Sequence, residues 1–135
     1  MPKIFQSFQL KSIPTDRFVM SPVELKEYID FEVKRVYFVT EPKKETGSHC
    51  HKIEHEFFIM IKGTCTAMID QGRGIEEIKM TGPTSAIYVP PYVWHSFKDF
   101  SPDAILLALT STNYNPDRSD YIEDYIVFCS LKLRR

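Results

Sequence analysis

The alternation of hydrophobic and polar residues divides most of the chain into short strands separated by turns. Successive side chains of a strand point to opposite faces, and β-branched and aromatic residues favour this conformation. The segments with these features are Val33–Thr40, Phe57–Ile61, Thr64–Asp70, Ile75–Met80, Ser85–Val89 and Ala104–Thr110. Phe57–Ile61 is apolar throughout, which is typical of a strand covered on both faces. Many short strands of this kind predict an all-β sandwich or barrel.

Turn residues and capping signals assign the segments between these strands. Glu41–Ser48 is polar and contains a proline and a glycine, so we expect a loop. Ser21–Tyr28 begins with Ser-Pro-Val-Glu, a capping box with proline at the first helical position, and we expect a short helix. A second short helix is predicted to begin at Asp120. No repeat, low-complexity tract or linker divides the chain, so we expect one domain over residues 1–135.

Length and composition narrow the class of protein. A chain of 135 residues fits one domain, and its 43% of hydrophobic residues fits a globular fold. A net charge of −1 gives no field for nucleic acid or an anionic membrane. The chain has neither an apolar run of about 18 residues nor an apolar stretch near its start. We therefore expect no membrane span, no signal peptide and a cytoplasmic location.

The four histidines of the chain all fall within two short motifs. Three lie in the segment His49–Glu56, and the fourth is His95. His49 and His51 are two residues apart, so on a strand they face the same side while Cys50 faces the other. Histidine ionises near neutral pH and serves both proton transfer and metal binding. The clustering therefore predicts a single site built around these rings.

The spacing of the first motif resembles the first motif of the cupins. Four residues separate His51 from Glu56, and six separate Glu56 from Gly63, which gives the pattern HxH(x)4E(x)6G. The second motif is a looser match to PxGxxH, because Tyr92 stands in place of its glycine, three residues before His95. The resemblance implies a cupin, a double-stranded β-helix or jelly-roll barrel, here with short peripheral helices.

Beyond the cupin motifs, the chain resembles the sugar-nucleotide 3,4-ketoisomerases, also called the WxcM-like family. The matching stretches are Lys34–Phe38, Gly47–Lys52, Val93–His95, Phe100–Ser101 and Asp120–Tyr125. The last stretch resembles the DYIRxY ending of the family. The resemblance covers residues 30–128, which is most of the chain.

The resemblance implies an isomerase. Members of this family move the keto group of a thymidine-diphosphate-linked (dTDP-linked) 4-keto-6-deoxyhexose from C4 to C3, in the biosynthesis of 3-amino-3,6-dideoxy sugars for polysaccharides. They form jelly-roll homodimers and use no metal or other cofactor. The expected partners are therefore the dTDP-sugar and a second copy of the chain.

The resemblance also assigns roles to residues. The expected catalytic residues are His49, His51 and Tyr37. The expected substrate-binding residues are Arg35, Lys52, Trp94 and His95. Thr46 stands where many members carry an arginine, so Lys43, Lys44 or Lys52 would supply that anion contact. A 3,4-keto shift needs a base to take the C3 proton, which gives an enediol, and an acid to return a proton at C4; a neutral imidazole suits the base near pH 7.

Several positions keep two interpretations. Arg35, on a strand, needs an anionic partner, which is either a nucleotide phosphate or an internal carboxylate. Trp94 either forms a wall of the sugar pocket or lies in the core. His55 should face away from its neighbour Glu56, as a surface or packing residue. Glu56 itself stands where many family members carry glutamine.

A carboxylate at this place completes a set of metal ligands. His49, His51, Glu56 and His95 together would suit Fe, Mn, Ni or Zn. Four hypotheses therefore remain: the ketoisomerase, a metal-dependent cupin enzyme such as a dioxygenase, a non-catalytic module that binds a sugar nucleotide, and a C3/C5 epimerase of related barrel shape.

Overall fold

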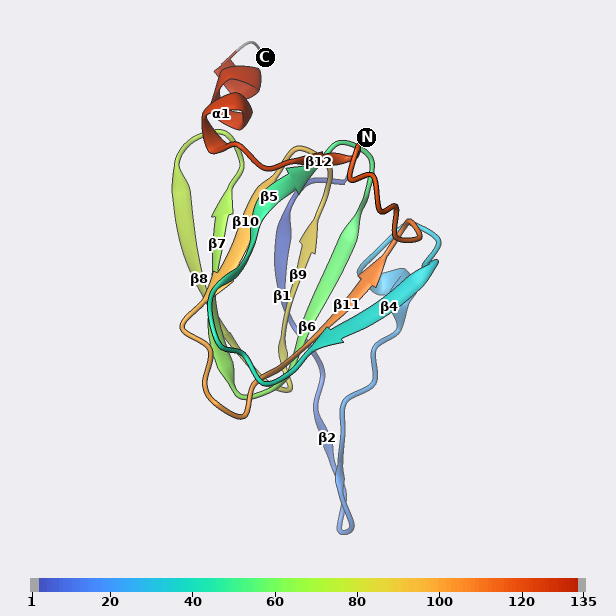
Figure 1. Cartoon of the computed structure of the whole chain (residues 1–135). Helices are drawn as coiled ribbons and strands as arrows, with labels where there is room; N and C mark the ends of the chain where they lie inside the picture. The colour runs from blue at the N-terminus through green and yellow to red at the C-terminus, as the bar shows by residue number, and fades with distance from the viewer. Residues whose placement is uncertain (1–2, 134–135) are drawn as a thin grey trace.

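The computed structural model describes residues 3–133 and shows two antiparallel β-sheets that face each other (Figure 1). The strands of the first sheet, in spatial order, are β1 (Gln6–Gln9), β9 (Ser85–Val89), β6 (Glu56–Lys62), β11 (Ile105–Thr110) and β4 (Arg35–Val39). Those of the second sheet are β12 (Tyr121–Ile122), β5 (Thr46–His51), β10 (Trp94–Lys98), β7 (Thr64–Asp70) and β8 (Ile75–Thr81). This arrangement confirms the predicted all-β jelly-roll fold.

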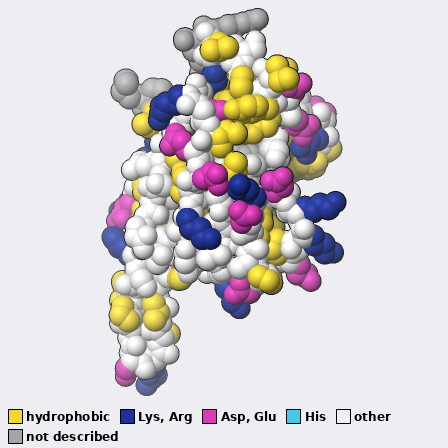
Figure 2. All heavy atoms as spheres, turned by 90° about the vertical axis from the view of Figure 1, so that its left-hand side faces the viewer, with side chains coloured by type: hydrophobic (Ala, Val, Ile, Leu, Met, Phe, Trp, Pro, Cys, Tyr) yellow, Lys and Arg dark blue, Asp and Glu magenta, His cyan; other side chains and the backbone are white. Residues whose placement is uncertain are grey.

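The other elements lie at the periphery of the two sheets. They are the strands β2 (Ile13–Pro14) and β3 (Val19–Met20), the 3₁₀ helix η1 (Leu25–Glu27) and the helix α1 (Tyr125–Leu133). β2 and β3 pair into a hairpin that projects from the barrel (Figure 1), and hydrophobic side chains lie on its surface (Figure 2). Within residues 3–133, no helix has the length and apolarity needed to cross a membrane.

β6 carries the continuous apolar run because both of its faces are covered. Phe58 and Met60 join the main core between the two sheets. Phe57 and Ile59 point to the opposite face and pack in a second cluster with residues such as Tyr28. The alternation of side chains along a strand makes this two-sided burial possible. The prediction of a strand covered on both faces is confirmed for Phe57–Met60, whereas Ile61 is 40% exposed.

A third cluster lies under α1, on the outer face of the second sheet. Its buried members are Cys50, Trp94, Ile122 and Phe128, from β5, β10, β12 and α1. Cys50 is completely buried there. Because Cys50 points outward, its neighbours His49 and His51 point between the sheets, as the spacing predicted.

The predicted helix over Ser21–Tyr28 is largely wrong. Only Leu25–Glu27 is helical, and its N-cap is Glu24, whose side chain makes no capping hydrogen bond. Tyr28 and Ile29, which follow at once, are buried in the cluster on the outer face of the first sheet. This tertiary packing takes precedence over the local helix signal.

The predicted start of the second helix at Asp120 is also wrong. Tyr121 and Ile122 instead form β12, which pairs with the end of β5. The helix begins at Tyr125, because the Asp124 carboxylate accepts the N–H of Ile126 at 2.9 Å and caps the first turn. Because β12 pairs with β5, the Tyr121 ring lies against His49 and His51.

Candidate active site

Four side chains with ligand or proton-transfer chemistry meet between the two sheets. His49 and His51 lie on β5 and His95 on β10, in one sheet, whereas Glu56 begins β6 in the other. His49 stands opposite His95 in the pairing of β5 with β10. One nitrogen or oxygen atom from each of the four residues lies within 4.8 Å of the others. The structure therefore brings together the residues that the two sequence motifs contributed.

Each of the three imidazoles has its Nδ1 atom against an oxygen that accepts a hydrogen bond. The pairs are His49 with the carbonyl of Gly47 (3.0 Å), His95 with the carbonyl of Val93 (3.1 Å) and His51 with Oδ2 of Asp120 (3.0 Å). Each Nδ1 atom therefore carries a hydrogen. A neutral ring in this state has its only lone pair on Nε2, on the side of the ring away from that oxygen.

The two histidines of β5 differ in protonation. Their Nε2 atoms lie 3.1 Å apart, so one of them must donate to the other. Burial lowers the pKa of His49 to about 3, and the neighbouring His95 adds to the effect. Burial also lowers the pKa of His51, but a hydrogen bond to Glu56 and three nearby carboxylates outweigh it and raise the pKa. His51 is therefore the donor and His49 the neutral acceptor.

Two buried carboxylates lie beside His51. Oε1 of Glu56 is 3.1 Å from Nε2 of His51, and Oε2 accepts the Tyr37 hydroxyl at 2.9 Å. Burial opposes the ionisation of Glu56, but His51 and His95 hold its pKa below the usual range. Oε2 of Glu54 lies 3.2 Å from the same Nε2 atom. Burial and the charge of Glu56 raise the pKa of Glu54.

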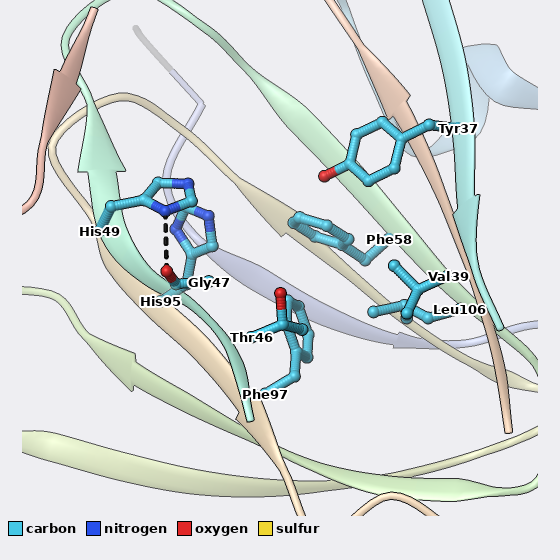
Figure 3. A pocket seen from close by; sticks show the side chains of 9 residues that line it. All are labelled: Tyr37, Val39, Thr46, Gly47, His49, Phe58, His95, Phe97 and Leu106. Atoms are coloured by element: carbon cyan, nitrogen blue, oxygen red, sulfur yellow. Dashed lines mark hydrogen bonds between the residues drawn. The ribbon is translucent and has the colours of Figure 1, made fainter. Parts of the chain in front are cut away.

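A cavity of about 70 Å³ opens beside two of the histidines (Figure 3). Its walls are Tyr37, Val39, Thr46, Gly47, His49, Phe58, His95, Phe97 and Leu106. The hydroxyl of Tyr37 points toward the histidines. Burial and the adjacent Glu56 raise the pKa of Tyr37, so this hydroxyl stays protonated. Of the two β5 histidines, His49 forms part of the wall, whereas His51 is buried behind it.

Arg35 precedes Tyr37 by two residues on β4 and has an internal partner. Its Nη2 atom donates to Oε1 of Glu54 at 3.0 Å, and its guanidinium lies 5.4 Å from the Tyr37 ring and 5.8 Å from the Tyr114 ring. Its Nε atom is buried and has no hydrogen-bond partner among residues 3–133. The sequence left two anionic partners open for Arg35, an internal carboxylate and a nucleotide phosphate, and Glu54 is such an internal carboxylate. Contact of Arg35 with a nucleotide phosphate stays a prediction.

Sequence reasoning missed the role of Tyr121 at this site. The centroid of its ring lies 4.8 Å from that of His49 and 4.5 Å from that of His51. The guanidinium of Arg118 lies 3.9 Å from the same ring. In the sequence, the Asp120–Tyr125 stretch indicated a family resemblance. It did not indicate that Tyr121 and Ile122 pair with β5.

Lys52, Trp94 and His55 do not line the cavity. Trp94 is buried beneath α1, where its ring packs against Phe128. Lys52 is exposed at the end of β5. A substrate contact by Lys52 or Trp94 stays a prediction. Nδ1 of His55 lies 2.6 Å from the Tyr88 hydroxyl, in the packing position expected for a side chain that faces away from Glu56.

The four convergent residues also fit a metal ion, which the cupin fold commonly carries. The Nδ1 atoms are held by oxygen acceptors, as in metal-bound histidines. Oε1 of Glu56 is buried and accepts no hydrogen bond from a hydroxyl or backbone N–H of the described chain. His49, His51, Glu56 and His95 would hold the ion, which would polarise a carbonyl oxygen. The absence of a metal, which the family resemblance implies, stays a prediction.

Comparison with known proteins identifies the family. The family model FdtA, described as WxcM-like, C-terminal, matches residues 4–133. The chain belongs to this WxcM-like family. The match includes the N-terminal segment, in which the sequence showed little resemblance.

Several relatives of the chain are named as 3,4-ketoisomerases or 3,4-oxoisomerases. The TDP-4-oxo-6-deoxy-α-D-glucose-3,4-oxoisomerase of Aneurinibacillus thermoaerophilus is 36% identical over 117 residues, which cover 85% of this chain and 83% of the relative. A mutant of the 3,4-ketoisomerase QdtA from Thermoanaerobacterium thermosaccharolyticum, in complex with TDP-4-keto-6-deoxyglucose, is 28% identical and has a TM-score of 0.87, over 100% of this chain and 98% of that one. A 3,4-ketoisomerase from Helicobacter canadensis is 27% identical with a TM-score of 0.85, over 96% of this chain and 97% of that one.

Proposed function

We propose that this protein is a sugar-nucleotide 3,4-ketoisomerase, which moves the keto group of a dTDP-linked 4-keto-6-deoxyhexose from C4 to C3. The observation that carries the proposal is the pair of adjoining imidazoles at the cavity, with His49 in the wall and His51 buried behind it. Burial lowers the pKa of His49, and the carboxylates around His51 raise the pKa of that ring. The names of the relatives support an isomerase and give no support to a dioxygenase or a binding module.

His49 is the base of the proposed reaction. Its lone pair is on Nε2, because Nδ1 donates to the carbonyl of Gly47, and it is free for the substrate when His51 donates to Oε1 of Glu56, 3.1 Å away, instead of to His49. The C3 proton of the substrate is acidic because C3 is adjacent to the C4 carbonyl, and its transfer to Nε2 gives an enediol. O4 gains a proton, O3 loses one and C4 receives one, so substrate and product contain the same atoms. The next enzyme would be an aminotransferase that acts on the new C3 keto group.

Tyr37 and His95 complete the proposed contacts with the sugar. The Tyr37 hydroxyl is protonated, is held by Glu56 and points into the cavity, so it can donate to a sugar oxygen. His95 lies in the same wall, with its Nδ1 atom held by a backbone carbonyl. The apolar side chains opposite, such as Phe58 and Leu106, exclude water from the enediol.

The protein is also proposed to form a homodimer through β4. This strand lies at the edge of the first sheet, where its backbone can pair with another strand. Val36 and Phe38, on its outer side, are 55% and 67% exposed. The β2–β3 hairpin exposes further hydrophobic residues, Ile13, Phe18, Val19 and Met20. Exposed apolar surface of this kind marks sites of association.

The proposed function is tested by incubating the protein with dTDP-4-keto-6-deoxyglucose and recording the proton NMR spectrum of the product. The expected product is a dTDP-3-keto-6-deoxyhexose, and its couplings give the configuration at C4. Recovery of unchanged substrate, or of an epimer at C3 or C5 that keeps the C4 ketone, would contradict the assignment.

A further inference from the structure

Asp120 lies against the end of β5 through five hydrogen bonds. Its backbone carbonyl accepts the N–H of Lys52 at 2.8 Å. Its carboxylate accepts the N–H groups of Lys52 (3.0 Å), Ile53 (2.6 Å) and Glu54 (3.3 Å), and Nδ1–H of His51 (3.0 Å). These bonds join residues that are 66 to 69 positions apart in the sequence. They therefore depend on the folded position of the segment before β12.

The two oxygens of the Asp120 carboxylate have different partners. Oδ1 accepts from the backbone of Lys52 and Ile53, whereas Oδ2 accepts from the ring of His51 and the backbone of Glu54. All four groups donate, so an ionised carboxylate, which only accepts, satisfies them. The backbone bonds hold the turn that leads from β5 to β6. The bond to His51 holds the ring itself.

The bond from His51 to Asp120 decides where the ring keeps its hydrogen. Glu54 and Glu56 both lie on the Nε2 side of the ring, at 3.2 and 3.1 Å. With no acceptor at Nδ1, these carboxylates would draw the single hydrogen of a neutral ring to Nε2. With Asp120 in place, the hydrogen on Nδ1 of His51 is held, so the ring can release its Nε2 hydrogen and remain stable with hydrogen on Nδ1.

We propose that Asp120 is a positioning residue for the isomerisation, which keeps hydrogen on Nδ1 of His51 so that only the Nε2 hydrogen, facing His49, is exchanged during turnover. The inference rests on the proposed function and adds a residue to it. It also gives a physical role to the Asp-Tyr pair that begins the C-terminal family stretch. Asp120 holds His51 from behind, and Tyr121 packs against the rings of both β5 histidines.

The test compares Asp120→Asn with Asp117→Asn. The amide oxygen of the first variant can still accept from Lys52 and Ile53, but its NH₂ group, facing His51, can only donate. Nδ1 of His51 must then become an acceptor, with the hydrogen on Nε2. We expect kcat to fall by about 10²-fold or more, with KM within about threefold of the wild type. Asp117 is exposed, and its carboxylate accepts the N–H of Ser119 in the same segment, so its variant should keep wild-type kcat.

A second readout is the tautomer of His51, recorded by long-range ¹H–¹⁵N NMR of the protein without substrate. The wild type should show hydrogen on Nδ1, and Asp120→Asn should show a lone pair there. A kcat within about threefold of the wild type, or loss of activity with the Nδ1 hydrogen retained, overturns the proposal. If the variant does not fold, the wild-type spectrum decides, because Nδ1 of His51 without hydrogen also overturns it. A wild-type protein with hydrogen on Nδ1 but no isomerase activity would refute the proposed function instead, and the catalytic role with it.

Discussion

His51 lies within 3.2 Å of an oxygen from each of three carboxylates, those of Glu54, Glu56 and Asp120. His49, two residues earlier, has a backbone carbonyl and His51 itself as its hydrogen-bond partners. Identical side chains on the same face of one strand therefore have opposite pKa shifts. At the scale of single residues, the groups around each imidazole determine its pKa, and therefore whether it accepts or donates a proton.

Replacement of either histidine should stop most turnover. His49→Asn and His51→Asn should each lower kcat by about 10²-fold or more, because each removes a positioned proton donor or acceptor. Binding of dTDP, measured by calorimetry, should change little if the nucleotide lies away from the reacting carbons. His55→Asn is the matched control, since His55 packs on the outer side and should leave kcat near the wild-type value. Near-normal turnover in both test variants would refute the acid–base assignment.

Removal of metal ions should leave the activity intact. An isomerase that works through the histidines alone should retain its turnover after dialysis against EDTA. Glu56→Gln should be mild, within about tenfold in kcat, because the amide oxygen can still accept the Tyr37 hydroxyl. Loss of activity on chelation that one divalent ion restores would instead assign His49, His51, Glu56 and His95 as metal ligands.

The sequence predicted the convergent histidines and Glu56, because their spacing within two motifs is local. Glu54 and Asp120 were not predicted as site residues. Their contacts with His51 depend on the crossing from β5 to β6 and on the pairing of β12 with β5, which local patterns do not encode. Trp94 was expected to contact the sugar or the core, and only the packing of α1 shows that it is buried in the core. These differences follow from tertiary structure that a single sequence does not reveal.

At the scale of elements, β5 brings the site together because it runs between β12 and β10. Strands with strong local patterns were predicted well, and Thr64–Asp70 and Ser85–Val89 match β7 and β9 in full. The loop expected over Glu41–Ser48 is wrong from Thr46 onward, because a polar, glycine-containing segment pairs with β10 despite its weak strand propensity. The β1 strand and the β2–β3 hairpin lacked a clear alternating pattern and were not predicted.

Gly47 is required where β5 passes β10. Its φ is 94°, and a Cβ atom there would lie 2.9 Å from Cα of Ser96. Gly74 has a similar φ of 101° but open space around its Cβ position. Gly74→Ala should therefore cost only the backbone strain, about 1 kcal/mol of unfolding free energy. Gly47→Ala should cost about 1–3 kcal/mol more, because β5 must move away from β10.

Urea unfolding of the two glycine variants measures this difference. Gly47→Ala should also lower kcat, since its carbonyl accepts Nδ1–H of His49 and moves with the strand. Gly74→Ala should keep wild-type turnover. Equal loss of stability in both variants would show that the close approach of β5 to β10 is not a constraint.

At the scale of the whole molecule, two sheets enclose the site, and the edge strand β4 exposes apolar side chains. The histidines come from one sheet and Glu56 from the other, so the barrel must close for them to meet. Along the open edge, β4 exposes Val36 and Phe38 while its inward residues Arg35 and Tyr37 serve the site. Association through β4 would therefore cover the strand that carries two of the site residues.

A charged residue on β4 should separate the proposed dimer. Phe38→Glu places a carboxylate where Phe38 is 67% exposed, and burial of an unpaired charge opposes association. Analytical ultracentrifugation should show a dimer for the wild type and a monomer for this variant. Ile126→Glu, on α1, changes a residue that is 79% exposed and should remain a dimer. A monomeric wild type at micromolar concentration would contradict the dimer.

The proposed isomerisation depends on proton transfer through an enediol, and turnover in D₂O tests this step most directly. dTDP-4-keto-6-deoxyglucose is converted in D₂O, and the product is examined by proton NMR and mass spectrometry. Because a histidine base exchanges its proton with the solvent, the expected result is a 3-keto product with deuterium at C4. Partial incorporation would fit a site shielded from water. Product formed at a normal rate with hydrogen alone at C4 would contradict the enediol route and the role of the histidines in it.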